Sequence, residues 1–498
     1  MMKQFIQINP DDNVAVALQD LPRATSCQLD NGQLITLVDE IKRGHKFALS
    51  QILANENIIK YGSPIGHATE LIAVGSWVHT HNLKTNLSGV YEYSYQPQLK
   101  QLAFVNEQRS FMGYRRSNGN VGIRNELWII PTVGCVNGTA ESIRDKFLAQ
   151  VGQLNNVECV NILKHSFGCS QLGDDHCNTR TILAAAALHP NCGGALVLGL
   201  GCENNTMPEF IKTLGDYDQS RVKYLVSQQV SDEVAAGVEV LHELYALMQD
   251  DQRSECPLSE LKIGLKCGAS DGFSGISANP LVGAFSDYMV AQGASTILTE
   301  VPEMFGAETI LMQRAINREV YDKTVALINN FKNYFIAHNQ EIYENPSPGN
   351  KAGGISSLED KSLGCTQKSG VAPVVGVLEY GEQLTQNGLN LLNAPGNDLV
   401  ASSALAASGC QMVLFTTGRG TPFGSFVPTI KISTNSAIAE LKPHWIDFNA
   451  GKLLDDQSME QVLHDFISYI LEVAEGKLVN NEINQFRELA IFKSGVTL

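Results

Sequence analysis

The sequence lacks any long hydrophobic run and has little positive charge. No apolar stretch approaches the roughly 18 residues of a membrane span, and the first residues, MMKQFIQINPDDN, lack the apolar core of a signal peptide. The 36 Lys and Arg residues against 52 Asp and Glu residues give a formal net charge of −16. This balance argues against nucleic acid or an anionic membrane as the partner, whereas a small acidic substrate can still bind in a local basic pocket.

Several short signatures are also missing. The eleven cysteines include no CxxC pair and do not show the spacing of a disulfide framework, so we expect reduced thiols in a cytoplasmic protein. The chain has no GxxxxGK[ST] phosphate loop, and no GxGxxG follows a strand in a dinucleotide-binding context. A nicotinamide-dependent enzyme is therefore disfavoured.

The 498 residues, of which 44% are hydrophobic, are enough for about three domains. Short strand-like runs separated by glycine turns predict a small β domain at residues 1–90, followed by a linker at residues 91–110. Repeated strand–loop–helix units then predict two α/β domains with largely parallel sheets, at residues 111–256 and 257–498. We place the boundary between them in the polar, Pro257-containing stretch 246–260.

One loop differs most from an ordinary connection. The stretch KCGASDGFSGISANP, residues 266–280, follows the strand-like run LKIGL and carries Ser270 and Asp271 among its glycines. It is longer than the usual connection of 2–6 residues, and ligands of open α/β sheets bind at the carboxyl ends of strands. We interpret it as a functional loop, with an ordinary connection as the alternative. Glu303 follows another predicted strand, in VPEMFG.

A histidine pair lies near the end of the β domain, in the sequence WVHTHN. His79 and His81 are two residues apart, so on a strand both side chains point to the same face. Two imidazoles on one face suit a divalent metal or a substrate carboxylate; a pair of exposed strand histidines is the alternative. His45, in a turn-like context, is interpreted as a surface histidine.

Basic residues occur in three further glycine-rich stretches. Arg115 lies in YRRSNGN, Lys351 is the one charge in NPSPGNKAGG, and Arg419 lies in FTTGRGTPFG. Such side chains bind carboxylates, and solvated surface positions are the alternative. Asn350 and Thr417 belong to the same loops as Lys351 and Arg419.

Four cysteines come directly after predicted strands: Cys135, Cys169, Cys202 and Cys267. Cysteine is small and apolar enough for a tight strand end, which is the interpretation we favour. The alternative is that three of them bind a soft metal or an iron–sulfur cluster. His165 and Cys169 also form a possible nucleophile pair, but no oxyanion signature accompanies them.

Taken together, the loop motifs resemble the altronate dehydratase/galactarate dehydratase family from about residue 10 to about residue 455. They are YGSPIGHAT, HTHNLKTNLSG, GYRRSNGNVGIRN, GLGCENN, LKCGASDGFSGISANP, TEVPEMFGAE, NPSPGNKAGG and FTTGRGTPFG. The resemblance implies an N-terminal β-clip domain of the SAF type and a hydro-lyase that converts D-altronate into 2-dehydro-3-deoxy-D-gluconate and water. It also implies a divalent metal, Fe²⁺ or Mn²⁺, and we expect a homo-oligomer, most simply a dimer.

The alternatives are galactarate dehydration, sulfolactate sulfo-lyase activity, or a non-catalytic sugar-acid-binding protein. Proton abstraction next to a carboxylate builds up two negative charges, so the reaction needs positive charge near the substrate. On this basis, we expect His79 and His81 to contact the metal or the substrate. We expect Asp271 and Glu303 to act as acid, base or further metal ligands. We expect Arg115, Lys351 and Arg419 to bind the carboxylate, and Lys351 is also a candidate catalytic proton carrier. We expect Ser270, Asn350 and Thr417 to bind the sugar hydroxyls.

Overall fold

The computed structural model describes residues 3–29, 31–102, 108–455 and 457–497. It confirms the expected fold class, a small N-terminal β domain followed by α/β segments with parallel sheets. Within the described ranges, no helix is long and apolar enough to cross a membrane.

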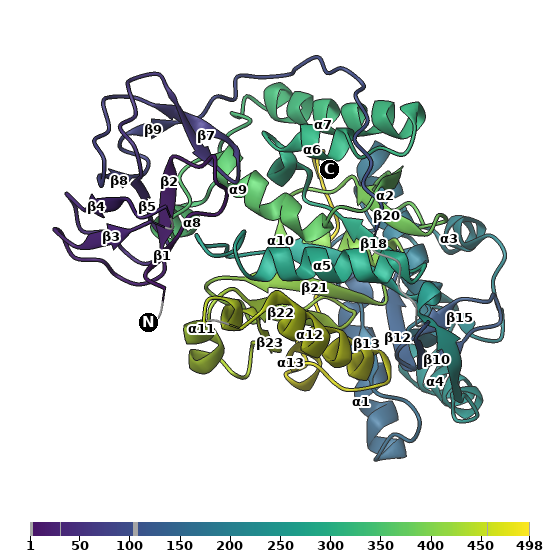
Figure 1. Ribbon diagram of the computed structural model, residues 1–498. Helices are drawn as coiled ribbons and strands as arrows, with labels where there is room; N and C mark the ends of the chain where they lie inside the picture. The colour runs from purple at the N-terminus through teal and green to yellow at the C-terminus, as the bar shows by residue number, and fades with distance from the viewer. Residues whose placement is uncertain (1–2, 30, 103–107, 456, 498) are drawn as a thin grey trace.

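The N-terminal β domain consists of short antiparallel strands and lies at one side of the molecule, next to helices α8 and α9 (Figure 1). A four-stranded sheet has the order β1 (Phe5–Ile6), β2 (Val14–Ala17), β5 (Lys46–Ala48), β8 (Trp77–Val78). The other strands form a two-stranded and a three-stranded sheet: β3 (Ser26–Gln28) with β4 (Leu34–Thr36), and β6 (Asn57–Lys60), β7 (Ser63–Ala68), β9 (Leu83–Lys84). Two apolar clusters fill this domain.

The chain leaves the β domain as an extended segment, without helix or strand between residues 85 and 102. This segment is held against the C-terminal domain. The Tyr93 hydroxyl donates a hydrogen bond of 2.5 Å to Glu308, and Lys332 forms a 2.8 Å ion pair with the same carboxylate. A three-stranded antiparallel sheet comes next, in the order β11 (Val121–Gly122), β10 (Ser110–Arg115), β16 (Arg253–Pro257).

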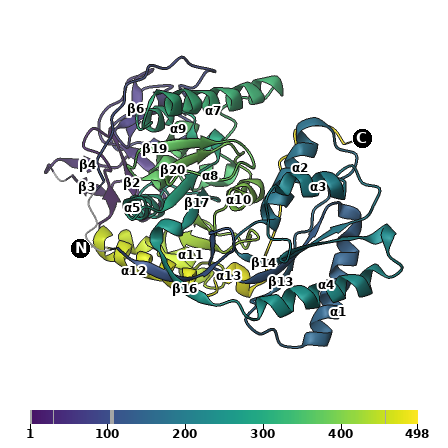
Figure 2. The same ribbon diagram turned by 90° about the vertical axis from the view of Figure 1, so that its right-hand side faces the viewer.

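The second domain is a four-stranded parallel sheet with helices on both faces (Figure 2). Its strand order is β13 (Val160–Ile162), β12 (Glu126–Pro131), β14 (Cys192–Gly199), β15 (Val222–Val226). Helices α1 (Asn137–Val151) and α4 (Glu233–Met248) pack on one face. Helices α2 (Gly173–Ala187) and α3 (Met207–Leu214) pack on the other, where their core is continuous with that of the C-terminal domain.

The C-terminal domain contains a seven-stranded parallel sheet. Its order is β19 (Val374–Leu378), β20 (Gly388–Leu392), β18 (Ser295–Leu298), β17 (Lys262–Cys267), β21 (Met412–Thr417), β22 (Thr429–Ser433), β23 (Phe448–Asn449). The interior strand β21 is buried along its whole length, as expected for a parallel sheet covered on both faces. The covering helices are α5 (Ala278–Ala291), α7 (Arg318–Ala337), α10 (Asp398–Ala407) and α12 (Met459–Ala474). The shorter helices are α6 (Glu308–Met312), α8 (Pro348–Ala352), α9 (Leu358–Cys365), α11 (Ser436–Leu441) and α13 (Asn480–Ile483).

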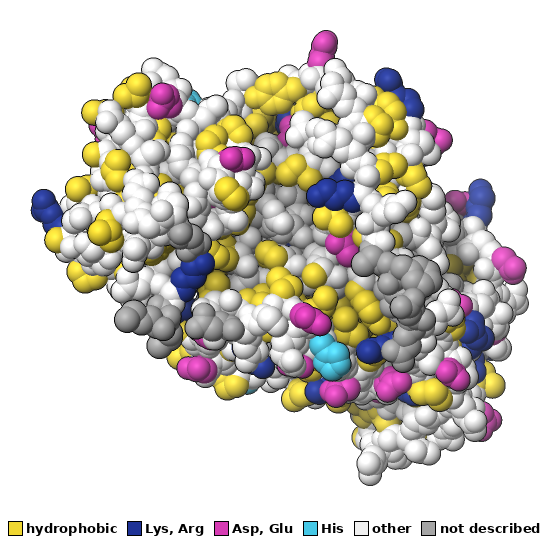
Figure 3. All heavy atoms as spheres, in the orientation of Figure 1, with side chains coloured by type: hydrophobic (Ala, Val, Ile, Leu, Met, Phe, Trp, Pro, Cys, Tyr) yellow, Lys and Arg dark blue, Asp and Glu magenta, His cyan; other side chains and the backbone are white. Residues whose placement is uncertain are grey.

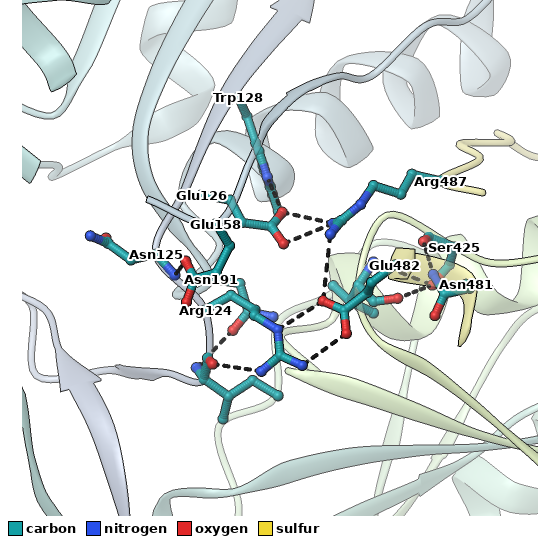
Figure 4. A network of polar contacts seen from close by, with 12 residues as sticks. Arg124, Asn125, Glu126, Trp128, Glu158, Asn191, Ser425, Asn481, Glu482 and Arg487 are labelled. Atoms are coloured by element: carbon teal, nitrogen blue, oxygen red, sulfur yellow. Dashed lines mark hydrogen bonds and ion pairs between the residues drawn. The ribbon is translucent and has the colours of Figure 1, made fainter. Parts of the chain in front are cut away.

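A buried ion network joins the second domain to the C-terminal domain (Figure 4). Arg124, before β12, contacts both carboxylate oxygens of Glu482 in α13, each at 2.8 Å. Arg487 contacts Glu482 at 3.4 Å and Glu126 at 2.8 and 2.9 Å. Burial opposes ionisation of Glu482, but Arg124 outweighs it and lowers the pKa of the carboxyl.

The surface shows charged side chains of both signs scattered over the face in Figure 3, without a continuous basic patch on that face.

The Glu482 network yields a stability prediction. Glu482→Ala should lower the apparent free energy of unfolding by about 3–5 kcal/mol, because it leaves the buried guanidinium of Arg124 without its ion-pair partner. Urea unfolding followed by circular dichroism measures the change. The control is Glu319→Ala, which removes an exposed i,i+4 partner of Lys323 and should leave the midpoint unchanged. Equal unfolding midpoints for wild type and both variants would show that the network does not couple the two domains.

Candidate functional site

The predicted functional loop lies where the β domain meets the C-terminal domain. It runs from the end of β17 to the start of α5, as predicted. Gly272 donates a backbone hydrogen bond of 2.7 Å to Gly353 in the segment after α8. A Cβ added at Gly272 or at Gly354 would lie 2.1 or 2.2 Å from the carbonyl oxygen of Gly44 in the β domain. Only glycine at these positions permits so close an approach between the two domains.

Two lysines of the β domain share one carboxylate of helix α9. Lys46 and Lys60 contact the two oxygens of Asp360 at 2.8 and 2.9 Å, and all three side chains are buried. Lys46 also donates to the carbonyl of Gly354 and to the Ser356 hydroxyl, at 2.8 and 2.7 Å. Burial lowers the pKa of Lys46 to about 8. Burial would raise the pKa of Asp360, but the two lysines lower it below its usual range, so the cluster carries more positive than negative charge.

The prediction that His79 and His81 share one face of a strand is wrong. Strand β8 ends at Val78, and both histidines lie in the turn that follows. His79 is buried and its Nδ1 lies 2.9 Å from the Ser356 hydroxyl, whereas His81 is exposed and lies against the Trp77 ring. Burial, with the nearby Lys46 charge, lowers the pKa of His79 to about 3, so its imidazole is neutral near pH 7. His45, which we expected at the surface, is buried, with its ring centroid 5.0 Å from that of His79.

Asp271 lines two cavities. The open one, of about 250 Å³, is lined by Arg43, Asp271, Phe273, Ala352, Gly353, Arg419 and Asn435. The smaller one is lined by Asp271 together with residues that include Lys60, Tyr61, Ser270, Asp360, Lys361 and Cys365. Burial raises the pKa of Asp271, although the carboxylate accepts hydrogen bonds from Thr434 at 2.9 and 3.0 Å. The Ser270 hydroxyl in the smaller cavity is buried and has no hydrogen-bond partner among the described residues.

Glu303 lies deeper, in a sealed cluster. It accepts hydrogen bonds from the thiols of Cys267 and Cys365 at 3.1 and 3.2 Å and forms a 2.8 Å ion pair with Lys361. Burial opposes its ionisation, but Lys361 and two further buried lysines outweigh it and lower the pKa of Glu303 to about 2. Glu303 is therefore a fixed anion that holds Lys361 in place.

A chain of contacts connects Glu303 to the functional loop. Lys361 donates to the side-chain oxygen of Asn350 at 3.3 Å, and Asn350 donates to the backbone carbonyl of Ser270 at 2.9 Å. Asn350 thus holds the loop in place through its own side chain. The structure brings together Ser270, Asp271, Glu303 and Asn350 in one continuous region.

The remaining predicted residues differ in position. Arg419 is exposed, lines the open cavity and donates to the carbonyl of Gly349 at 3.0 Å. Thr417 is buried, and its hydroxyl accepts from the backbone of Gly420 at 2.9 Å, so it shapes the Arg419 loop. Lys351 is exposed on α8.

Arg115 lies apart from this region. It belongs to the sheet of β10, β11 and β16, where its guanidinium lies 3.6 Å from Glu260 and 3.3 Å from the carbonyl of Gly119. It lines a different cavity, which none of the other predicted site residues lines. The structure therefore does not bring Arg115 to the predicted site.

His79 and His81 do not form the expected metal site. In the described part of the chain, His79 and His81 do not form a compact group of three metal-binding donors with another histidine, cysteine or carboxylate. The one compact group of donors there is Cys267, Glu303 and Cys365. Hydrogen bonding to Cys267 and burial raise the pKa of the Cys365 thiol well above its usual range, and Lys361 occupies the Glu303 carboxylate. In this structure both thiols donate hydrogen bonds to the Glu303 carboxylate, which holds the group together.

Sequence reasoning missed Arg43, Lys46, Lys60, Asp360 and Lys361. Lys46 and Lys60 lie on strands whose alternation predicts nothing about a partner that is 314 and 300 residues away, respectively. The polar spacing of SLEDKS is typical of an exposed helix, yet α9 is entirely buried. The one available signal for Arg43 was its place beside Gly44, in the turn before β5.

Comparisons with known proteins agree with this arrangement of three parts. The model of the altronate/galactarate dehydratase SAF domain matches residues 3–86. The D-galactarate dehydratase/altronate hydrolase second-domain model matches residues 113–249, and the D-galactarate/altronate dehydratase C-terminal model matches residues 258–497.

Three relatives align over nearly the whole chain. Altronate dehydratase of Bacillus subtilis (strain 168) is 61% identical over 498 residues, which is 100% of both chains. Altronate dehydratase of Escherichia coli (strain K12) is 58% identical over 99% of this chain and 100% of its own length. Galactarate dehydratase (L-threo-forming) of Escherichia coli (strain K12) is 32% identical over 98% of this chain and 96% of its own.

The buried neutral His79 gives a pH prediction. The unfolded chain protonates this histidine near its ordinary pKa of 6.5, whereas the folded chain does so only near 3. Stability is therefore lost as the pH falls from about 6.5 towards 3, with a slope of at most about 1.4 kcal/mol per pH unit from this group. His79→Gln should flatten the dependence of unfolding free energy on pH between 6 and 4, measured by urea titration. The exposed His464→Gln is the control, and an unchanged slope in His79→Gln would contradict the assignment.

Proposed function

Because the chain belongs to the D-galactarate/altronate dehydratase family, we propose that it is a hydro-lyase that removes water from D-altronate to give 2-dehydro-3-deoxy-D-gluconate. The observation that carries the proposal is the full-length identity of 61% and 58% to two proteins named altronate dehydratase. The identity of 32% to a galactarate dehydratase makes that substrate the second candidate. A non-catalytic sugar-acid-binding protein is not favoured.

We propose that the sugar acid binds in the open cavity at Asp271. Arg43 from the β domain and Arg419 from the C-terminal domain line it together, so two guanidinium groups are available for the substrate carboxylate. Lys351 belongs to α8, whose Ala352 lines the same cavity. Ser270, with its unused buried hydroxyl, is the hydroxyl-binding candidate, while Asn350 and Thr417 shape the loops around it.

The reaction breaks the C–H bond next to the carboxylate and the C–O bond of the neighbouring hydroxyl. The electron pair of the C–H bond forms the double bond, the hydroxyl leaves as water after gaining a proton, and the enol product tautomerises to the keto acid. Asp271 is the acid–base candidate of the two carboxylates, because burial raises its pKa whereas that of Glu303 is lowered. Glu303, with a pKa of about 2, is a poor proton carrier and positions Lys361.

His79 is a hydrogen-bonding side chain in this scheme. A neutral imidazole with a pKa of about 3 is too weak a base to take a proton from carbon at pH 7. It orients the Ser356 hydroxyl, to which Lys46 also donates a hydrogen bond. His81 lies beside it at the surface. The divalent cation, Fe²⁺ or Mn²⁺, remains part of the proposal and would supply Lewis acidity when bound, but His79 and His81 alone do not make its site.

The protein is further proposed to be cytoplasmic and to form a homo-oligomer, most simply a dimer. The absence of a CxxC pair and of a disulfide framework supports the compartment. Sedimentation equilibrium of the purified chain measures its oligomeric state directly.

A substrate panel tests the activity. The purified chain, supplied with Fe²⁺ or Mn²⁺, should form a 2-keto acid from D-altronate, with a kcat/KM at least about tenfold above that for D-galactarate and for sulfolactate, since about 1.4 kcal/mol of differential transition-state binding gives this ratio. Keto-acid formation is followed by semicarbazide absorbance. Preference for galactarate would move the substrate assignment to the second candidate, and no keto acid from any of the three would contradict the hydro-lyase proposal.

The two cavity arginines give a separate prediction. Arg43→Met and Arg419→Met should each raise the KM for D-altronate by about 10-fold to 150-fold, because a hydrogen bond to a charged group is worth about 1.5–3 kcal/mol. Steady-state kinetics measures the change. Arg23→Met, at an exposed arginine of the same β domain, is the matched control and should behave as wild type. Unchanged KM values in both cavity variants would place the carboxylate elsewhere.

A further inference from the structure

The second domain repeats one dipeptide at three neighbouring strand ends. Gly134-Cys135 follows β12, Gly168-Cys169 follows β13 and Gly201-Cys202 follows β14. These strands are adjacent and parallel in the order β13, β12, β14, so their carboxyl ends lie along the same edge of the sheet. The three cysteines therefore belong to three loops that share one edge.

The three loops are bonded to one another. The backbone of Gly134 donates to the carbonyl of Phe167 at 2.8 Å, and that of Asn205 donates to the carbonyl of Gly168 at 3.0 Å. The backbone of Ser170 donates to the side chain of Asn204 at 2.9 Å. The Cys169 loop thus contacts the Cys135 loop on one side and the Cys202 loop on the other. Gly168 has φ +102°, and a Cβ there would lie 2.2 Å from the carbonyl oxygen of Thr132, so this packing requires glycine.

All three cysteines are exposed, which a packing role does not explain. Cys267, the fourth cysteine after a predicted strand, is buried, as a small apolar residue at a strand end should be. Cys135, Cys169 and Cys202 are exposed instead, although cysteine is among the most buried residue types. Three exposed thiols on mutually bonded loops form a set of soft donors.

We propose that Cys135, Cys169 and Cys202 bind an iron–sulfur cluster. Three thiolates on a single zinc ion, with Zn–S bonds of about 2.3 Å, lie about 3.8 Å apart. The three sulfur atoms are not all within 4.8 Å of one another in the described chain. A cluster holds its thiolates further apart, because each binds a different iron. A [4Fe–4S] cluster usually takes four cysteines, so three leave one iron free for an oxygen ligand.

A buried amide beside Cys169 supports this assignment. The side-chain oxygen of Gln171 accepts from the backbone of Gly168 at 3.3 Å and from the Thr179 hydroxyl at 2.9 Å. Its amide nitrogen is buried and has no partner among the residues that the structure describes. Buried amide donors are nearly always hydrogen-bonded, and N–H donors to sulfur tune iron–sulfur clusters. None of these residues lines the cavities at Asp271, so the cluster site is distinct from the proposed sugar-acid site.

The test is the iron and sulfide content of the full chain. The protein is purified without oxygen and incubated with Fe³⁺, sulfide and a thiol reductant that reduces part of the iron to Fe²⁺, and excess reagents are removed. Wild type should retain about four iron and four sulfide ions per chain, as for a [4Fe–4S] cluster, with visible charge-transfer absorption and an electron paramagnetic resonance signal after reduction. Wild type that retains no sulfide, or that binds only zinc from a metal mixture, would overturn the proposal.

Variants assign the ligands. Cys135→Ser/Cys169→Ser/Cys202→Ser should lose at least about nine-tenths of the iron and sulfide while its circular dichroism spectrum stays that of wild type. Cys177→Ser, an exposed cysteine of the same domain on α2, is the matched control and should keep the full content. If the triple variant does not fold, the three single variants serve, and each should lower the cluster content. Full content in the folded triple variant, or in every single variant, would exclude these cysteines as ligands.

Discussion

The site depends on one buried carboxylate that two lysines share. Asp360 in α9 holds Lys46 and Lys60 of the β domain, at 2.8 and 2.9 Å, inside a region where none of the three is exposed. Removing Asp360 would leave two buried lysines without their counter-charge, so this carboxylate fixes the β domain in one position over the C-terminal domain. It also leaves an excess of positive charge behind the cavity in which a sugar acid would bind.

That fixed position sets the electrostatics of the side chains around it. Lys46 and burial together keep His79 neutral, whereas burial raises the pKa of Asp271 and three lysines keep Glu303 ionised. The two carboxylates thereby have different roles: Asp271 acts in proton transfer and Glu303 in positioning. The same docking places Arg43 beside a cavity that otherwise belongs to the C-terminal domain.

Much of the fold and part of the site could be predicted from the sequence. Strand–loop–helix order is local, so the loop after β17 was predicted correctly, and the structure brings Ser270, Asp271 and Asn350 together. Lys46 and Asp360 could not be found, because a lysine on a short strand and a polar helix both predict exposure until the partner is known. The histidine pair failed for a local reason: the strand ends one residue before His79, so strand alternation no longer applies. The position of Arg115 could not be predicted, because its motif contains no information about which edge of the molecule it reaches.

The most direct test is to determine where a sugar acid binds. A crystal structure of the Asp271→Asn variant soaked with D-altronate would show it, since the variant lacks the proposed proton carrier but keeps the shape of the cavity. The substrate carboxylate should lie within hydrogen-bonding distance of Arg43 or Arg419, between the β domain and the C-terminal domain. Altronate bound in the separate cavity at Arg115, with the cavity at Asp271 filled only by water, would contradict it.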